Sequence, residues 1–449
     1  MPKPPQRAAF RTILLASGWA ENAEIDIDPR GLIAGIRCRK KPSPGAVKGI
    51  AVPAPVNAHS HAFQRAFAGR TEKKGADDFW AWRRVMYQDL RRITPEKMAA
   101  IAGWLYAEML KAGFGGVCEF HYLHRREDGR SLRPPTAMAD AIVAAAKVSG
   151  IDLTLLPVLY QREDFNTPGV ADSQRAFYNS LGEFRKLAQA LKSKHQTVRH
   201  GVALHSLRAV PEDVVKNAAN IFREGPIHIH IAEQTREVEN CLRVHRRRPV
   251  EWLLENAPVD ERWNLVHATH ATPDELRALA RKGANAILCP TTEANLGDGI
   301  FSFADYAHAE GSFAIGSDSQ VSVDPREELR LLEYGQRLIA RKRAIAADSA
   351  NPHPGANLWK AAVKGGLKAA GWKGEGIEVG APATIAVLDD NAPSLAGRRA
   401  DEALDALVFA GQPTPVRDVM VRGKWAVKDF RHIHESRLKS QFLKAMTTL

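Results

Sequence analysis

Histidine and acidic side chains recur at the ends of short apolar runs in this chain of 449 residues. His59 and His61 follow one such run. Because they are two apart in an extended backbone, both imidazoles project to the same side, as two ligands of one metal ion must. The sequence contains two other His-x-His pairs, so this spacing alone is weak evidence. A third imidazole at His230 and a carboxylate at Asp318, each closing another run, complete a His3Asp set suited to zinc.

A His3Asp set has a defined chemistry. It leaves one coordination position for water, whose pKa the metal lowers toward neutrality, so hydroxide becomes available for attack. Two further polar residues lie at the same kind of position, since Glu233 comes three residues after His230 and His267 ends another apolar run. The pattern therefore favours a hydrolytic metal site over an isolated histidine pair.

The elements that must position these residues are short apolar runs alternating with longer helical stretches, an order typical of a parallel sheet wound by helices. Eight runs can be delimited, at residues 49–57, 115–122, 152–160, 201–207, 227–232, 264–268, 284–290 and 313–317. Eight βα units predict an α/β fold, a (β/α)8 barrel of the TIM type. In such a barrel functional side chains gather at the C-terminal ends of the strands, where these histidines and Asp318 fall.

Start and stop signals for helices lie between the runs. Thr94 and Pro95 open one helix as cap and first-turn proline, Gly113 ends it, and Thr272 with Glu275 forms a capping box for another. The flanks carry short β-like runs punctuated by Gly, Pro and Asp. We therefore expect a small β-sandwich domain built from both termini, residues 1–55 with 380–449, beside a metal-dependent barrel over residues 56–379.

Composition narrows the classes of function. No apolar run approaches the length of a membrane span and the start lacks the apolar core of a secretory signal, so we expect a cytoplasmic chain without a membrane partner. The net charge is +12, but Lys and Arg are interleaved with acids, so we expect no nucleic acid partner and, weakly, an anionic substrate. The four cysteines form no CxxC pair, so no disulfide framework or thiolate zinc site is indicated.

The pair His432 and His434 is expected on an exposed C-terminal segment without a metal.

Eight local motifs span the predicted barrel: HSHAFQR at 59–65, FWAWR at 79–83, EFHY at 119–122, HSLRAV at 205–210, HIAEQ at 230–234, VHATH at 266–270, CPTTE at 289–293 and GSDS at 316–319. With these motifs the chain resembles the amidohydrolase superfamily and, within it, the formimidoylglutamate deiminase family. The resemblance covers essentially the whole barrel.

The resemblance implies one zinc ion per chain with four ligands, His59, His61, His230 and Asp318. It further implies that Glu233, His267 and Asp318 handle protons. Asp318 can touch the metal and accept the proton of its water, His267 can orient that water or stabilise developing charge, and Glu233 can pass a proton to the departing nitrogen. The sequence offers no evident lysine placed to bridge a second ion.

The substrate implied by the resemblance is N-formimino-L-glutamate, which is converted to N-formyl-L-glutamate and ammonia in histidine degradation. Its two carboxylates require cationic partners, and arginine supplies a planar bidentate fork. The residues that match substrate-contact positions of the family are Gln64, Arg83, Tyr122, His205 and Arg208. The resemblance also suggests a homodimer.

Several alternatives remain open at this stage. Another deaminase of the superfamily would act on guanine or a related heterocycle, although a neutral ring would leave two guanidinium groups without anionic partners. A different formimino-amino acid, such as the aspartate derivative, would share the metal site. A non-catalytic metal-binding barrel is opposed by the presence of Glu233 and His267 beside a full ligand set. Iron or manganese in place of zinc is equally open.

Overall fold

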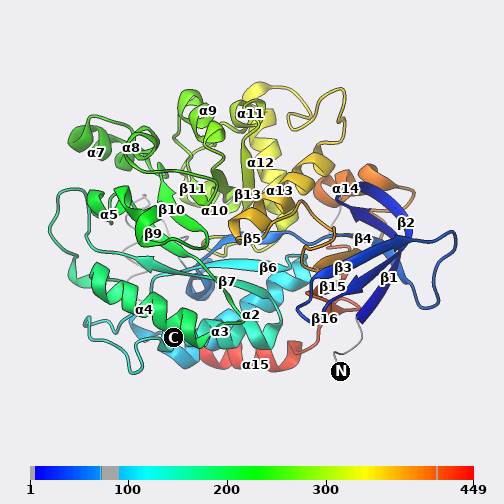
Figure 1. The fold of residues 1–449 in the computed structure, drawn as a ribbon, viewed down its shortest axis with the longest axis horizontal. Coiled ribbons are helices and arrows are strands. Elements are labelled where there is room, and N and C mark those ends of the chain that lie inside the picture. Colours follow the sequence, from blue (N-terminus) through cyan, green and yellow to red (C-terminus); the bar gives the residue numbers. More distant parts are fainter. Residues whose placement is uncertain (1–5, 71, 73–89, 411–412) are drawn as a thin grey trace.

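The computed structural model describes residues 6–70, 72, 90–410 and 413–449. Eight parallel strands follow one another around a barrel in the centre of the molecule (Figure 1). In order around the barrel they are β5 (Val56–Ser60), β6 (Gly116–His121), β7 (Asp152–Leu159), β9 (Val202–Ser206), β10 (Ile227–Ile231), β11 (Trp263–His267), β12 (Asn285–Leu288) and β13 (Ser312–Ile315). A parallel bridge between Ser60 and Asp318 joins the two ends of this sheet, and the short β8 (Arg199–His200) pairs with β7. The predicted (β/α)8 fold is confirmed.

The first predicted strand is wrong in its bounds, whereas the other seven agree with the structure to within two residues at each end. A single strand was expected over residues 49–57. The structure instead has β4 (Val47–Pro53), which belongs to a different sheet, and β5, which begins at Val56 and carries His59. Pro53 and Pro55 explain the break, because proline has no N–H to donate to a β ladder.

Helices cover the outside of the barrel. The longer ones are α2 (Pro95–Ala112), α3 (Ala137–Ser149), α4 (Leu181–Lys194), α7 (Thr235–His245), α8 (Pro249–Asn256), α9 (Pro273–Arg281), α12 (Pro325–Ala340) and α13 (Pro354–Ala369). The predicted helix signals hold. The Thr94 hydroxyl caps α2 by accepting from Lys97 N, Gly113 ends it at φ 112°, and Thr272 forms the capping box of α9 with Glu275.

Both ends of the chain build a second, mixed sheet, here called the terminal sheet. Its order is β17 (Arg431–His432), β16 (Lys424–Lys428), β15 (Val416–Val421), β14 (Ile385–Leu388), β4, β1 (Gln6–Leu15), β2 (Gly18–Ile27) and β3 (Ile33–Cys38). It has a small core of its own that includes Phe10, Ile25, Ile385 and Met420. The expected β unit made from both termini is therefore present, while the boundaries at 55 and 380 stay a prediction.

Of the C-terminal His-x-His pair, His434 is exposed as predicted, whereas His432 is not. His432 is buried, and its Nε2 donates to the Ser149 carbonyl oxygen at 2.7 Å. The segment therefore packs against the C-terminal end of α3. It continues into α15 (Glu435–Met446), which lies beside α2, where Trp104 stacks on Phe442.

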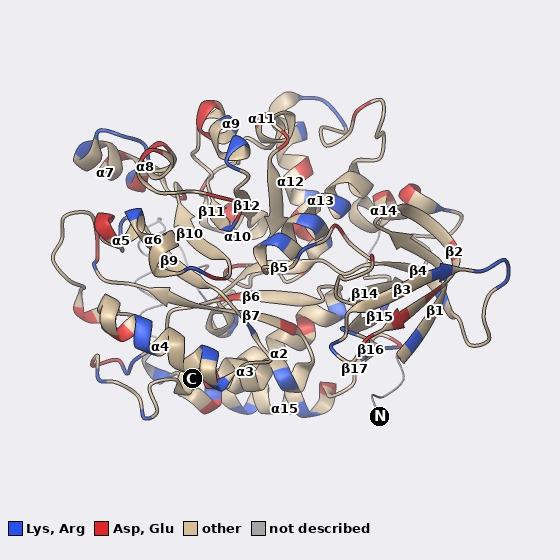
Figure 2. Ribbon diagram, viewed as in Figure 1, with Lys and Arg blue, Asp and Glu red and all other residues tan. Residues whose placement is uncertain are grey.

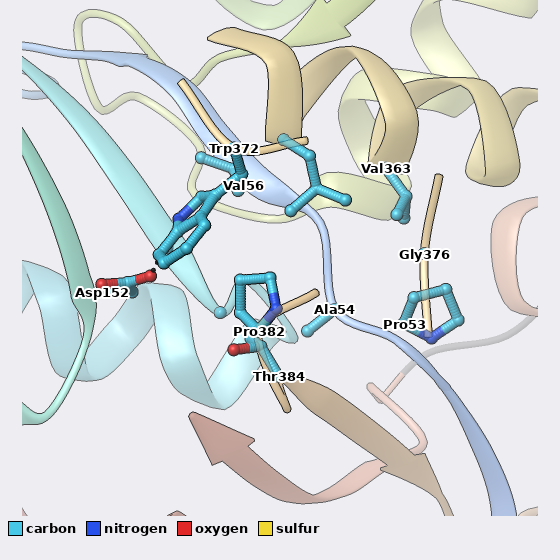
Figure 3. Close-up of a pocket in the computed structure, with 12 residues that line it drawn as sticks. Pro53, Ala54, Val56, Asp152, Val363, Trp372, Gly376, Pro382 and Thr384 are labelled. Carbon is cyan, nitrogen blue, oxygen red and sulfur yellow. Dashed lines mark hydrogen bonds between the residues drawn. The ribbon is translucent and has the colours of Figure 1, made fainter. Parts of the chain in front are cut away.

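The terminal sheet meets the barrel at the N-terminal ends of its strands. A small cavity there is lined by the starts of β5, β6 and β7 and by Trp372, whose Nε1 donates to Asp152 Oδ2 at 3.2 Å (Figure 3). The guanidinium of Arg199 lies 3.5 Å from the Trp372 ring centroid. Arg422, which directly follows β15 of the terminal sheet, lies 3.7 Å from Asp152 Oδ1, so the sheet is tied to the end of the barrel opposite to His59 and this cavity belongs to the junction.

Charges are spread over the ribbon. Lys and Arg occur on helices and loops of the barrel and of the terminal sheet alike, with Asp and Glu among them (Figure 2). Within the described part of the chain, no helix combines the length and the apolar character needed to cross a membrane.

Close packing of α13 on the barrel generates a stability prediction. A Cβ atom added at Gly365 would lie 1.8 Å from the Phe313 carbonyl oxygen in β13. Gly365→Ala must therefore push the helix off the strand, and since overpacking costs about 1–3 kcal/mol, we expect the Tm of a chain of this length to fall by about 1–3 °C. Gly182→Ala in α4, where an added Cβ meets nothing within 4 Å, is the matched control and should leave the Tm level or slightly raised. Equal Tm values for both variants would contradict this packing.

Candidate metal centre and active site

The structure brings four predicted metal ligands together, and we call them the donor cluster. His59 and His61 lie at the end of β5, His230 near the end of β10 and Asp318 just after β13, and all four are buried. His59 Nε2 lies 3.0 Å from His230 Nε2 and 3.2 Å from His61 Nε2. Asp318 Oδ1 lies 3.3 Å and 3.2 Å from the same two β5 ring nitrogens. Four donor atoms thus converge on one point.

Backbone carbonyls fix which ring nitrogens face that point. His61 Nδ1 donates to Phe120 O at 2.9 Å, and His230 Nδ1 donates to His205 O at 3.0 Å. A carbonyl can only accept, so Nδ1 carries a hydrogen in both rings and Nε2 is the nitrogen available to bind a metal. Burial lowers the pKa of His59 to about 3 and that of His230 well below its usual value, which favours the neutral rings. Lone pairs and a carboxylate oxygen therefore point at one another.

The donor cluster fits a tetrahedral divalent metal. Metal bonds of about 2.0–2.1 Å place neighbouring ligand atoms about 3.3 Å apart, close to the separations seen among these four atoms. A cation at the centre would convert mutual repulsion into attraction. A bound cation would also hold Asp318 as the carboxylate that its place among the ligands requires.

The backbone at two of these strand ends lies in the left-handed region. Asp318 has φ 43° and His267 has φ 68°, values that cost energy for residues other than glycine. The Asp318 conformation is held by two backbone hydrogen bonds to β5, from Asp318 N to His59 O at 3.0 Å and from His61 N to Asp318 O at 3.2 Å. The residues with strained backbone are thus two of those whose side chains form the site.

The three residues expected to move protons lie side by side. His267 Nε2 is 3.7 Å from Glu233 Oε1 and 3.8 Å from Asp318 Oδ2, and its Nδ1 is 3.2 Å from Glu293 Oε1. Burial alone would lower the pKa of His267, but the surrounding carboxylates of Glu233, Glu293 and Asp318 raise it to about 10. The His267 imidazole can therefore hold a proton on Nε2 between the carboxylates of Glu233 and Asp318.

Sequence reasoning missed several acidic groups around this centre. Glu293, the last residue of the CPTTE motif, holds the His267 ring, while Asp298 lies near Glu233 and His267 and hydrogen bonds with Gln234. Burial and the charge of Glu233 raise the pKa of Asp298 to about 9. The available signal was their position in the segment that follows β12, at the functional end of the barrel.

Four of the five residues predicted to contact substrate fall within the described part of the chain. Gln64 Nε2 donates to Tyr122 Oη at 3.2 Å, and the Tyr122 ring packs edge-on against His61 at 5.0 Å. The His205 ring lies 5.0 Å from that of His230. These side chains therefore border the donor cluster. Arg83 and its motif lie outside the described residues.

Arg208 is buried in a clasp between two loops. Its Nη1 donates to Glu163 O at 2.7 Å, in the loop after β7, while Arg162 Nε in that loop donates to Arg208 O at 3.0 Å. Arg162 also pairs with Glu212 at 2.8 Å. Burial raises the pKa of Glu237 to about 7 despite the opposing charge of Arg208, so a buried carboxyl lies within electrostatic reach of this arginine. The clasp fixes the Arg208 backbone and one guanidinium nitrogen.

Comparison with known proteins agrees with this geometry. The sequence pattern of the amidohydrolase family matches residues 50–426, and the chain therefore belongs to the amidohydrolase family. Within it, the chain is 46% identical over 443 residues to the formimidoylglutamate deiminase of Pseudomonas aeruginosa, covering 97% of this chain and 98% of that protein. That identity places it in the formimidoylglutamate deiminase family.

Solved structures show the same fold. An amidohydrolase from Brucella melitensis superposes with a TM-score of 0.94 at 41% identity, over 98% of this chain and 99% of that chain. An adenosine deaminase from Xanthomonas campestris with bound zinc superposes with a TM-score of 0.81 at 21% identity, over 100% of both chains. The second likeness concerns the fold alone.

The donor cluster predicts that metal stabilises the folded chain. Adding Zn²⁺ to chelator-treated protein should raise the Tm, because an ion bound only by the folded state contributes about 2.7 kcal/mol at 100 times its Kd. His59→Ala should lose this rise. His228→Ala removes a buried histidine of β10, two residues before the ligand His230, that donates to Ala369 O instead, so this variant should keep the rise from a lower starting Tm. A rise of wild-type size in His59→Ala would rule out the cluster as the binding site.

Proposed function

We propose that this chain is a zinc-dependent enzyme that hydrolyses N-formimino-L-glutamate to N-formyl-L-glutamate and ammonia. The observation that carries the proposal is the buried donor cluster with Glu233 and His267 directly beside it. The choice of substrate is supported by the 46% identity to a formimidoylglutamate deiminase over nearly the whole of both chains. The proposal includes one zinc ion per chain, a homodimer, and a place in histidine degradation in the cytoplasm.

Four residues would hold the zinc ion, His59, His61, His230 and Asp318. When bound there, zinc supplies Lewis acidity and lowers the pKa of water toward neutrality. The chain's own groups do the rest of the proton work. The free oxygen of Asp318 faces His267 and accepts the proton of the attacking water, and His267 donates a hydrogen bond to the oxygen that becomes negative.

Collapse of the tetrahedral adduct completes the reaction. Water adds its oxygen to the formimino carbon, and the bond from that carbon to the terminal nitrogen breaks. As the formyl C=O forms, the hydroxyl of the adduct loses the second water proton. Both water protons, the first of which Asp318 takes up, reach the terminal nitrogen through Glu233, which lies 3.7 Å from His267, so that the imino NH leaves as NH3. The product keeps its original amide nitrogen and gains a formyl oxygen, which balances one water consumed against one ammonia released.

Recognition of the substrate falls to residues around the cluster. We assign a carboxylate of the substrate to the buried guanidinium of Arg208, whose clasp fixes its position before binding. Arg83 is proposed as the second cationic partner. Gln64, Tyr122 and His205 are proposed to hydrogen bond to the rest of the molecule. Ammonia release measured side by side from N-formimino-L-glutamate, N-formimino-L-aspartate and guanine tests this choice, and faster release from guanine would overturn it.

Glu233 is proposed to transfer protons and not to bind zinc, so replacing it should affect turnover and not zinc content. Glu233→Gln should retain one zinc ion per chain in metal analysis and lose turnover by roughly 100-fold or more, the usual range for removing a general acid. Glu239→Gln, at an exposed position of α7, the helix that begins two residues after Glu233, is the control and should keep wild-type turnover. Two tightly bound ions per active chain, or loss of zinc from Glu233→Gln, would contradict the assignment.

Arg208→Met tests the carboxylate anchor. Removing one partner of a buried, hydrogen-bonded charge pair costs about 2–5 kcal/mol, so kcat/KM for N-formimino-L-glutamate should fall by roughly 100-fold or more. Methionine keeps much of the apolar stem, so the zinc content should be unchanged. Arg223→Met, at an exposed position, serves as the control. Near-normal efficiency in Arg208→Met would remove the main support for an acidic substrate.

A further inference from the structure

The junction between β13 and β5, here called the seam, is closed differently from the other seven junctions of the barrel. Each of those has at least two registered residue pairs in a parallel ladder. Between the described strands β13 and β5, the only pairing is the isolated bridge of Ser60 with Asp318. The seam nevertheless carries three of the four donor residues, so something other than a ladder must hold it.

Gln320 fills this role with its side-chain amide. Its Nε2 donates to Ser60 Oγ at 3.0 Å and to Asp318 O at 2.7 Å, and its Oε1 accepts from Ser317 Oγ at 2.7 Å. The residue is fully buried. One amide therefore ties the backbone of Asp318 on one side of the seam to the residue between His59 and His61 on the other.

The hydrogen-bond chain continues on both sides of Gln320. Ser317 Oγ also accepts from Asn57 Nδ2 at 2.5 Å, and Asn57 Oδ1 accepts from Ser317 N at 3.1 Å, across the seam. On the other side, Ser60 Oγ donates to Glu119 Oε2 at 2.8 Å. Glu119 also accepts from Ala62 N at 2.6 Å and is therefore anchored to the chain just after His61. Every link lies in the protein interior.

The backbone conformation explains why the seam requires these side-chain hydrogen bonds. Asp318 and Gln320 both have positive φ, 43° and 65°, so this turn relaxes unless its surroundings hold it. A Cβ atom at Gly316 would lie 2.7 Å from the Cβ of His59, so the two backbones already approach as closely as glycine allows. Side chains from both sides of the seam, Gln320 from the turn and Asn57 from β5, bridge what remains.

We propose that Gln320 is a positioning residue for the metal centre, which sets the affinity for zinc by locking Asp318 against the His59 and His61 strand. The proposal rests on the metal site of the proposed function. Residues that orient metal ligands typically change metal affinity by about 10- to 100-fold when they are replaced. A residue with a merely structural role would lower stability without changing that affinity.

The test compares two buried glutamines. Gln320→Leu removes the seam amide, whereas Gln336→Leu removes another buried amide, in α12, whose Nε2 donates to Phe301 O at 2.8 Å and not to a residue of the seam. For each full-length variant, the Kd for Zn²⁺ is measured by chelator competition and the Tm is measured on the metal-free protein. We expect both variants to lose Tm, but only Gln320→Leu to bind Zn²⁺ roughly 10- to 100-fold more weakly.

Two outcomes would overturn the proposal: wild-type Zn²⁺ affinity in Gln320→Leu, or equal weakening in Gln336→Leu. If Gln320→Leu does not fold, the milder variant Ser317→Ala can be used, which removes only the hydroxyl that donates to Gln320 Oε1. Ser317→Ala should weaken Zn²⁺ binding several-fold at a near-normal Tm. An unchanged affinity for Zn²⁺ in this variant would count against the proposal. A failure of the metal assignment itself is distinguishable, because the wild-type chain would then bind no Zn²⁺.

Discussion

The mutual repulsion of four electron-rich atoms is the constraint on which the rest of this structure depends. Three imidazole nitrogens and a carboxylate oxygen lie about 3 Å apart in a buried space, an arrangement that a cation alone makes favourable. The ring tautomers, the carbonyl acceptors behind the rings and the left-handed turn at Asp318 all serve to hold these atoms in place. A barrel provides this because it brings the ends of β5, β10 and β13 to one point.

The same space also concentrates negative charge around one imidazole. His267 lies among Glu233, Glu293 and Asp318, with Asp298 close by, so the site contains more carboxyl groups than its ligand set requires. Closely spaced carboxyls in a buried site cannot all ionise cheaply, which is why some of their pKa values rise. Such a site stores protons at positions beside the reacting atoms, as a reaction that takes a proton from water and gives one to ammonia requires.

Much of the site could be predicted from the sequence, because the alternation of apolar runs with helical stretches gives the order of the strands, and the site residues lie at the strand ends. Strand ends locate His59, His230, His267 and Asp318 once eight runs are recognised. Three-dimensional contacts that no periodicity encodes could not be predicted. Glu293 reaches His267 across 26 positions, and the Gln320 amide reaches Ser60 across 260. The split of the first strand at Pro53 was overlooked because both of its halves are apolar and buried, and His432 was misplaced because its burial depends on contact with Ser149.

The pairing of β4 with β14 has a consequence for the order in which the chain assembles during synthesis. Val52 pairs with Ala386, so the strand that leads directly into β5 has a partner made more than 300 residues later. All eight barrel strands emerge from the ribosome before β14 does, and the barrel can close while one edge of β4 is still bare. That edge is an unpaired row of backbone donors and acceptors next to apolar side chains, the kind of surface that invites pairing with another chain. For the time taken to translate the segment from β5 to β14, the nascent protein therefore presents a nearly complete catalytic barrel joined to an open strand.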